Sequence, residues 1–212
     1  ADQQGLRGGL AGLTYPLHSF DFETAGWTVP QLAGTRPYQA IPFQFSLHVI
    51  ERESGPVSHD EYLAEEPIDP RPALIEALSK IGPTGDILAY HASYEQRILR
   101  DLARDFPEHE RFLLGLVDRF KDLETPFLRF WHHHPDQHGR TSIKYVLPAL
   151  TGVTYDGMMI SDGNQAQREF VRVVFGTVAA QEKTDILDGL RAYCKQDTQA
   201  LVDVLGVLTN LV

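Results

Sequence analysis

The chain has a single cysteine, Cys194, among its 212 residues. An internal disulfide therefore cannot form, and we expect the protein to work in a reducing compartment such as the cytoplasm. No apolar run approaches the ~20 residues that a membrane-spanning helix needs, so we expect neither a membrane partner nor a secretory leader. Phosphate-binding glycine loops, dinucleotide fingerprints and the Gly-x-Ser-x-Gly motif are also missing, which argues against the enzyme classes that use them.

Basic residues are few: 19 Lys and Arg stand against 29 Asp and Glu, for a formal net charge of −10. This balance argues against a broad basic surface for duplex nucleic acid. The hydrophobic content of 42% supports one sizeable core. We expect residues 1–16, which are polar and glycine-rich, to be a flexible linker and residues 17–212 to form one domain. Such a linker indicates either a domain of a longer chain or a flexible terminus.

Two acidic residues alternate with aromatic residues near the start of the chain, in Ser19-Phe-Asp-Phe-Glu-Thr24. In a β-strand Phe20 and Phe22 would face one side, and Asp21 and Glu23 the other. Two parallel carboxylates on a half-buried strand repel each other, and a divalent cation between them removes that cost. The alternative is an ordinary amphipathic edge strand with a solvated acidic face.

A second acidic position lies on a long predicted helix over residues 184–208, whose apolar residues recur every three or four positions. Asp197 falls inside this apolar stripe, one turn after Tyr193. A buried, ionised aspartate is costly unless it is paired or binds a metal. A salt bridge to Arg191 or Lys195 is the alternative, but both lie around the helix from Asp197.

A third acidic position follows a short buried strand predicted at residues 86–90. Ser93 and Gln96 form a capping-box pattern that would open a helix over residues 93–105. Glu95 would lie in its first turn, in line with inward-facing leucines. The alternative is that Glu95 only complements the helix dipole.

Together, Asp21, Glu23, Glu95 and Asp197 resemble the metal-binding acids of the DEDD exonucleases, a family of the RNase H-like superfamily that includes DnaQ-like proofreading domains. The last motif is Tyr193-Cys-Lys-Gln-Asp197, which is similar to the tyrosine subtype of that family.

The second motif departs from the family pattern, because Tyr94-Glu95 stands where an aromatic residue followed by Asp is usual, and His91 replaces a common Asn. Asp118 and Asp122 are spare acids that could replace Glu95 in the site. The chain is most similar to uncharacterised bacterial nuclease-like domains, through four further segments: Gly34–Tyr38, Ile41–His48, Ser142–Pro148 and Tyr193–Thr198.

The resemblance implies an α/β fold with an RNase H-like mixed sheet, in which a three-strand antiparallel meander is joined by parallel strands and flanked by helices. The order of predicted elements agrees with this plan. We expect strands near 18–24, 43–52, 57–64 and 86–90, helices near 70–81, 93–105, 142–150, 166–178 and 184–208, and a mostly helical segment over 109–131.

The resemblance further implies a metal-dependent 3′–5′ exonuclease that acts on single-stranded DNA or RNA 3′ ends. Two Mg²⁺ or Mn²⁺ ions, about 3.5–4 Å apart, would be held by the four acids, and Tyr193 would orient the attacking water or the scissile phosphate. We expect six residues to contact the substrate: Thr24, Arg36, Tyr38, Gln44, His91 and Lys144. A further nuclease or helicase domain in a longer chain would be a partner. Two alternatives stay open: an inactive nucleic-acid-binding module of a larger nuclease, and an RNase H-like endonuclease.

Overall fold

Five segments between residues 17 and 122 form a five-stranded mixed sheet. The computed structural model describes residues 2–212. The strands are β1 (Leu17–Ala25), β2 (Ile41–Ile50), β3 (Val57–Leu63), β4 (Ile87–Ala89) and β5 (Phe120–Asp122). Their order is β3-β2-β1-β4-β5; the first three are antiparallel, and β4 and β5 run parallel to β1. The predicted α/β class is confirmed, and the sheet is consistent with an RNase H-like fold.

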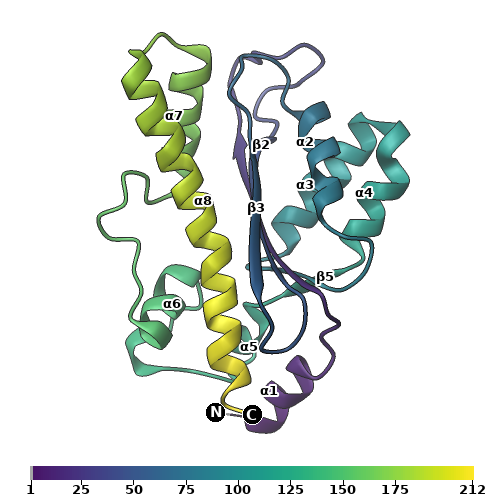
Figure 1. Cartoon of the computed structure of the whole chain (residues 1–212), viewed down its shortest axis with the longest axis vertical. Coiled ribbons are helices and arrows are strands. Elements are labelled where there is room, and N and C mark those ends of the chain that lie inside the picture. Colours follow the sequence, from purple (N-terminus) through teal and green to yellow (C-terminus); the bar gives the residue numbers. More distant parts are fainter. Residues whose placement is uncertain (1) are drawn as a thin grey trace.

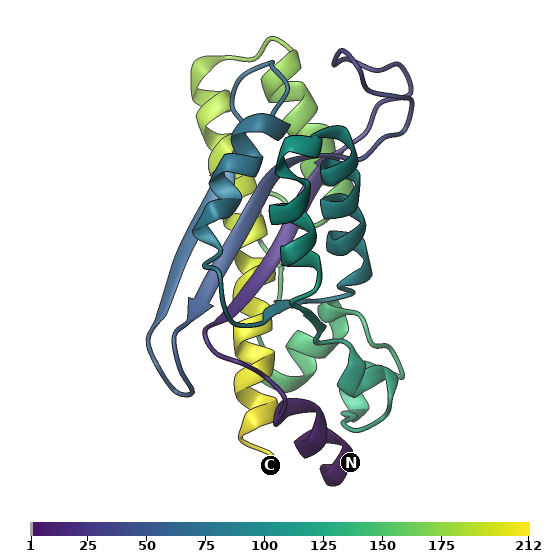
Figure 2. The ribbon, with the colours of Figure 1, turned by 90° about the vertical axis from the view of Figure 1, so that its right-hand side faces the viewer.

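Helices cover both faces of this sheet (Figure 1). Helices α6, α7 and α8 lie on one face, whereas α2, α3 and α4 lie on the other, where Figure 2 shows them in front of the strands. Both termini lie at the same end of the molecule. The helices are α1 (Gln3–Leu10), α2 (Arg71–Ala77), α3 (Ser93–Asp105), α4 (Glu110–Val117), α5 (Thr125–Leu128), α6 (Ile143–Thr151), α7 (Gly163–Phe175) and α8 (Ala180–Thr209). No helix within residues 2–212 is long and apolar enough to cross a membrane.

Each face of the sheet has its own hydrophobic core. On the α8 face, Phe43 of β2 stacks on Phe170 of α7, with ring centroids 3.8 Å apart. On the opposite face, Phe20 and Phe22 of β1 pack with Phe45 of β2. The predicted alternation of β1 is therefore confirmed, and its acidic residues are directed to the α8 face.

The segment expected to be a linker contains a helix, α1. Leu6 is buried, and the glycines at positions 5 and 9 leave room for the ring of Trp131 against the helix. A Cβ atom at either position would lie 2.5 Å from a Trp131 ring carbon. These glycines thus serve close packing, which composition alone cannot distinguish from linker flexibility.

The predicted helical segment over residues 109–131 is wrong in part, because β5 interrupts it between α4 and α5. Phe120 is buried, and the three residues of β5 pair in parallel with β4. The predicted capping box is also wrong. Helix α3 begins after Ala92 without a side-chain cap, and Gln96 Nε2 instead donates to the main-chain oxygen of Val117, at 3.2 Å.

Candidate active site

The unequal lengths of β1 and β4 create the site. Strand β4 pairs only with His18 and Ser19 of β1, so the rest of β1 extends past the end of β4. Helix α3 begins shortly after β4 ends and brings Glu95 to the exposed flank of β1. Ligand sites of α/β proteins commonly lie at this carboxyl edge of parallel strands. An irregularity in the pairing between Glu23 and Thr24 further distorts the strand beside the site.

A cleft of about 610 Å³ opens at this edge. Strand β1 and the first turns of α3, α6 and α7 form its walls, and the middle of α8 closes it. Eight of the residues predicted for the site line this cleft: Asp21, Glu23, Thr24, His91, Glu95, Lys144, Tyr193 and Asp197.

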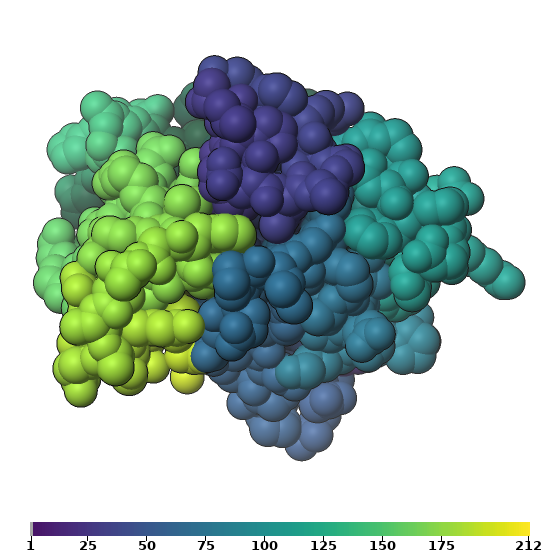
Figure 3. Space-filling model, turned by 90° about the horizontal axis from the view of Figure 1, so that it is seen from above, coloured from purple at the N-terminus to yellow at the C-terminus, as the bar shows by residue number. Residues whose placement is uncertain are grey.

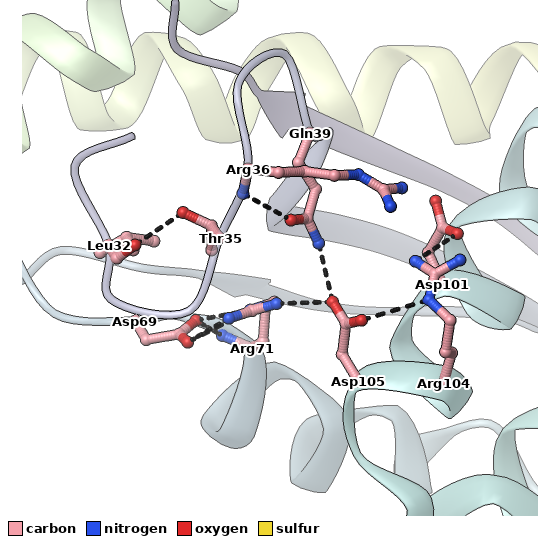
Figure 4. Close-up of polar contacts among 9 residues, drawn as sticks. All are labelled: Leu32, Thr35, Arg36, Gln39, Asp69, Arg71, Asp101, Arg104 and Asp105. Carbon is pink, nitrogen blue, oxygen red and sulfur yellow. Dashed lines mark hydrogen bonds and ion pairs between the residues drawn. The ribbon is translucent and has the colours of Figure 1, made fainter. Parts of the chain in front are cut away.

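Three predicted substrate contacts are not among the residues that line the cleft. Gln44 is fully buried, and its Nε2 donates to the main-chain oxygen of Leu190 at 3.0 Å, so it joins β2 to α8. Tyr38 is 75% exposed on the loop between β1 and β2. Arg36 lies on the same loop, and its side chain extends toward Asp101 of α3 (Figure 4).

An ion-pair network centred on the buried Arg71 connects this loop to α2 and α3 (Figure 4). Arg71 is 5% exposed and lies between Asp69, at 2.7 Å, and Asp105, at 2.9 Å. Gln39 Nε2 donates to the same Asp105 carboxylate at 2.7 Å, and Gln39 Oε1 accepts from the main-chain nitrogen of Arg36. Seen from above, the loop (purple) borders both the end of α7 and the start of α8 (yellow-green) and the segment leading into α2 (blue; Figure 3).

The pKa values of the four acids show that their charged forms are disfavoured in the cleft. Burial, followed by the charge of Asp197, raises the pKa of both Asp21 and Glu23 well above their ordinary values. Burial also raises the pKa of Glu95 to about 8 and that of Asp197 to about 6. Since one pKa unit corresponds to about 1.4 kcal/mol, ionising all four groups in the unliganded cleft is strongly unfavourable.

Three neighbours partly offset this cost at Asp197. Tyr155 Oη donates to Asp197 Oδ1 at 2.7 Å, and the Tyr193 hydroxyl and the positive charge of Lys144 also act to lower the pKa of this carboxyl. The ammonium group of Lys144 lies 5.5 Å from the ring centroid of Tyr155 and 5.8 Å from that of Tyr193. Burial and the nearby carboxylates raise the pKa of Tyr193, so its hydroxyl stays protonated and can orient a bound group but cannot accept a proton.

The two spare acids have different positions. Asp118 is exposed at the end of α4 and does not line the cleft. Asp122, at the end of β5, accepts hydrogen bonds from the main-chain nitrogens of His91, Ala92 and Glu124. It therefore supports the junction between β4 and α3, and its charge contributes to the raised pKa of Glu95.

Three residues at or beside the acids were not among those expected from the sequence: Glu124, Asp162 and Tyr155. Glu124 lines the cleft and is 8% exposed. Asp162 also lines it and caps α7, because its Oδ1 accepts from the main-chain nitrogen of Gln165 at 2.9 Å. An Asp before a run of helix formers is an N-cap signal that could have marked this position. The role of Glu124 depends on β5, which carried no such signal.

Helices α3, α6 and α7 all direct their N-terminal ends into the cleft. A Cβ atom on Gly163, the first residue of α7, would lie 3.6 Å from Glu23 Oε2, so this helix end meets the acid cluster directly. Helix N-termini carry partial positive charge and unpaired N–H groups, which stabilise nearby carboxylates and bind phosphate.

Comparison with known protein families gives one match, to the family described as "Domain of unknown function (DUF2779)", over residues 18–142. The chain belongs to this family. The matched region contains Asp21, Glu23 and Glu95, whereas Tyr193 and Asp197 lie beyond it. No curated protein and no solved structure matches the chain.

The acid cluster of this DUF2779 chain suits a hard divalent cation. Ligand atoms of Asp21, Glu23 and Cys194 all lie within 4.8 Å of one another. Burial raises the pKa of the Cys194 thiol, which is therefore neutral and a poor ligand, so the oxygen atoms remain as donors. Glu95 Oε2 is buried and has no hydrogen-bond partner within residues 2–212. Oxygen-only donors with an unsatisfied carboxylate fit Mg²⁺ or Mn²⁺ better than Zn²⁺.

Proposed function

We propose that this domain is a metal-dependent 3′–5′ exonuclease that acts on single-stranded DNA or RNA ends. The observation that carries the proposal is the convergence of four carboxylates on one cleft, from β1, α3 and α8. Folding brings these acids together although burial and mutual repulsion disfavour their charged forms. A divalent cation bound between the carboxylates would stabilise their charged forms.

Asp21, Glu23, Glu95 and Asp197 would hold the ions, two in number by resemblance to the DEDD exonucleases. Bound Mg²⁺ or Mn²⁺ supplies a more acidic water and offsets charge on the leaving oxygen. The hydrogen bond from Tyr155 to Asp197 Oδ1 restrains the orientation of this carboxylate before any ligand binds.

The other cleft residues suit an anionic substrate. Lys144 is the one lysine or arginine among the described residues that line the cleft, and the N-terminal ends of α3, α6 and α7 add partial positive charge. Tyr193, which lines the cleft, would donate a hydrogen bond to the attacking water or to the scissile phosphate. Thr24 and Tyr94, whose hydroxyls are hydrogen-bonded at 2.6 Å, form a wall beside Glu23.

The size of the cleft favours the end of a strand over a long duplex. At about 610 Å³ it lies within the range of sites that enclose one small organic ligand, which is the scale of a nucleotide. The net charge of −10 agrees, because the protein carries no excess of basic residues to track a long phosphate backbone.

The test is hydrolysis of 5′-labelled single-stranded DNA and RNA with Mn²⁺ or with EDTA, by the wild-type protein and by Asp21→Asn. Asp118→Asn is the matched control, since Asp118 is an exposed acid outside the cleft. We expect a ladder that shortens from the 3′ end, requires Mn²⁺ and disappears only in Asp21→Asn. Internal cuts would instead indicate an endonuclease. Metal-dependent binding without cleavage by the wild-type protein would indicate a binding module.

A further inference from the structure

His91, at the mouth of the cleft, has a backbone conformation that its residue type rarely adopts. Its φ is +64°, in the left-handed region that favours glycine. Asp122 holds it there: one carboxylate oxygen accepts from the His91 main-chain nitrogen at 3.0 Å, and the other accepts from that of Ala92 at 3.2 Å. Strained residues that the surrounding structure holds in place are concentrated at functional sites.

The imidazole ring of His91 has a contact of its own, with Glu124. His91 Nδ1 lies 3.2 Å from Glu124 Oε2, and the other oxygen, Glu124 Oε1, accepts from Thr141 Oγ1 at 2.7 Å. The Glu124 side chain is 10% exposed, whereas the His91 side chain is 71% exposed. One edge of the ring is therefore anchored to a buried carboxylate and the other edge, with Nε2, is presented to solvent. No hydrogen bond within residues 2–212 engages Nε2.

We propose that His91 Nε2 donates a hydrogen bond to a phosphate oxygen of the bound strand, and that Glu124 is the residue that positions the ring for it. This inference rests on the proposed function. His91 and Lys144 are the described side chains lining the cleft that can carry positive charge. In its protonated form the ring donates from both nitrogens, through Nδ1 to Glu124 and through Nε2 outward. A charge-assisted bond of this kind is about twice as strong as a neutral one.

The same contacts would also exist if the His91–Glu124 pair only stabilised the junction between β4 and α3. Replacement by glycine separates the two roles. Glycine adopts a positive φ without strain, so His91→Gly should keep or raise the midpoint of thermal unfolding while losing the phosphate contact. A structural role predicts the opposite, a loss of stability that accompanies the loss of the ion pair.

The decisive experiment measures binding by fluorescence anisotropy, with Ca²⁺ in place of Mn²⁺, so that it does not depend on cleavage. The probes are two labelled single-stranded oligonucleotides that differ only at the last 3′ linkages: one has phosphodiesters, and the other has uncharged methylphosphonates. The proteins are wild type, His91→Asn, His91→Gly, Glu124→Gln and the control His133→Asn, an exposed histidine outside the cleft.

We expect His91→Asn and His91→Gly to weaken binding of the phosphodiester probe about tenfold or more, the effect of losing a hydrogen bond to a charged group. Binding of the methylphosphonate probe should not change. Glu124→Gln should show the same selectivity with a smaller loss, because glutamine can keep the geometry without the charge. His133→Asn should bind as wild type does.

Equal losses on both probes, loss of stability in His91→Gly, or no binding by the wild-type protein would each overturn the inference. The outcome can be separated from that of the proposed function. A protein that binds selectively but never cleaves would refute the exonuclease proposal and keep the His91 contact, whereas an active enzyme with unaffected His91 variants would do the reverse.

Discussion

Replacing Glu95 by glutamine should shift the stability of the metal-free protein in favour of the variant as pH rises. Glu95 is 3% exposed, and one of its oxygens has no partner within residues 2–212. Burial, with a contribution from the charge of Asp122, raises its pKa from 4.5 to about 8. The folded protein therefore retains a proton on Glu95 at pH values where the unfolded chain has lost it.

The sign and size follow from linkage. A carboxyl whose pKa is raised on folding makes its full contribution to stability below pH 4.5, the unfolded value, and loses it as pH rises through about 8. At pH 7 the accumulated loss is about 3 kcal/mol, since each unit of pH above the unfolded pKa contributes about 1.4 kcal/mol. For a chain of this size that corresponds to roughly 6–12 °C in the unfolding midpoint. Glutamine does not titrate and avoids the loss.

The assay is thermal unfolding followed by circular dichroism in EDTA, at several pH values from 5 to 8.5, for wild type, Glu95→Gln and the exposed control Glu108→Gln. The glutamine amide could lack a partner and cost about 1–3 kcal/mol at every pH, so the slope of the difference with pH is the informative quantity. The difference should rise in favour of Glu95→Gln across this range. A difference that is independent of pH would refute the reasoning about Glu95. Adding Mn²⁺ should stabilise wild type more than the variant.

Three further variants test other parts of the structure. Thr198→Val removes a hydroxyl that bonds to Ser46 at 2.7 Å and to His48 at 2.9 Å; it should cost about 1–3 kcal/mol in urea unfolding, because buried polar groups lose their partner. Gly85→Ala should lower the unfolding midpoint markedly, since φ is +83° and the new Cβ would lie 1.9 Å from a main-chain oxygen; an unchanged midpoint would contradict this geometry. Arg71→Met should destabilise the fold by about 1–3 kcal/mol and increase proteolytic cleavage in the loop between β1 and β2, a site that limited digestion with mass spectrometry would identify.

Much of the sheet could be predicted because its long strands have clear sequence patterns. Strands β1 and β2 contain runs in which apolar and polar residues alternate, and loops that contain Gly and Pro separate β1, β2 and β3. Strand β5 has three residues and is stabilised by pairing with β4, a long-range contact that leaves no periodic signal. Helix α1 was not predicted for a different reason. Its glycines resemble the composition of a linker, whereas in the structure they leave room for Trp131.

The candidate site could be predicted where a residue breaks the pattern of its own element. Asp197 interrupts an apolar helical stripe, and Glu95 lies in line with buried leucines. Gln44 was expected to contact the substrate but lies in the core. Strand β2 is buried on both faces, so alternation cannot distinguish a residue that lines a cleft from one in the core. The sequence could not predict that Glu124 lines the cleft, because its position depends on the pairing of β5.

Two of the exceptions to ordinary folding rules in this protein lie at the cleft. Glu95 is a buried acid with an unsatisfied oxygen, and His91, four residues earlier, has a strained backbone. Both follow β4 directly, and both line the cleft that also holds the acids of β1 and α8. Residues that strain or destabilise the fold locally are expected at functional sites. Ligands of opposite charge would engage these two residues. A cation would bind the Glu95 carboxylate, and an anionic phosphate would contact the His91 imidazole. The proposed ligands, metal ions together with a nucleic-acid strand, would account for both.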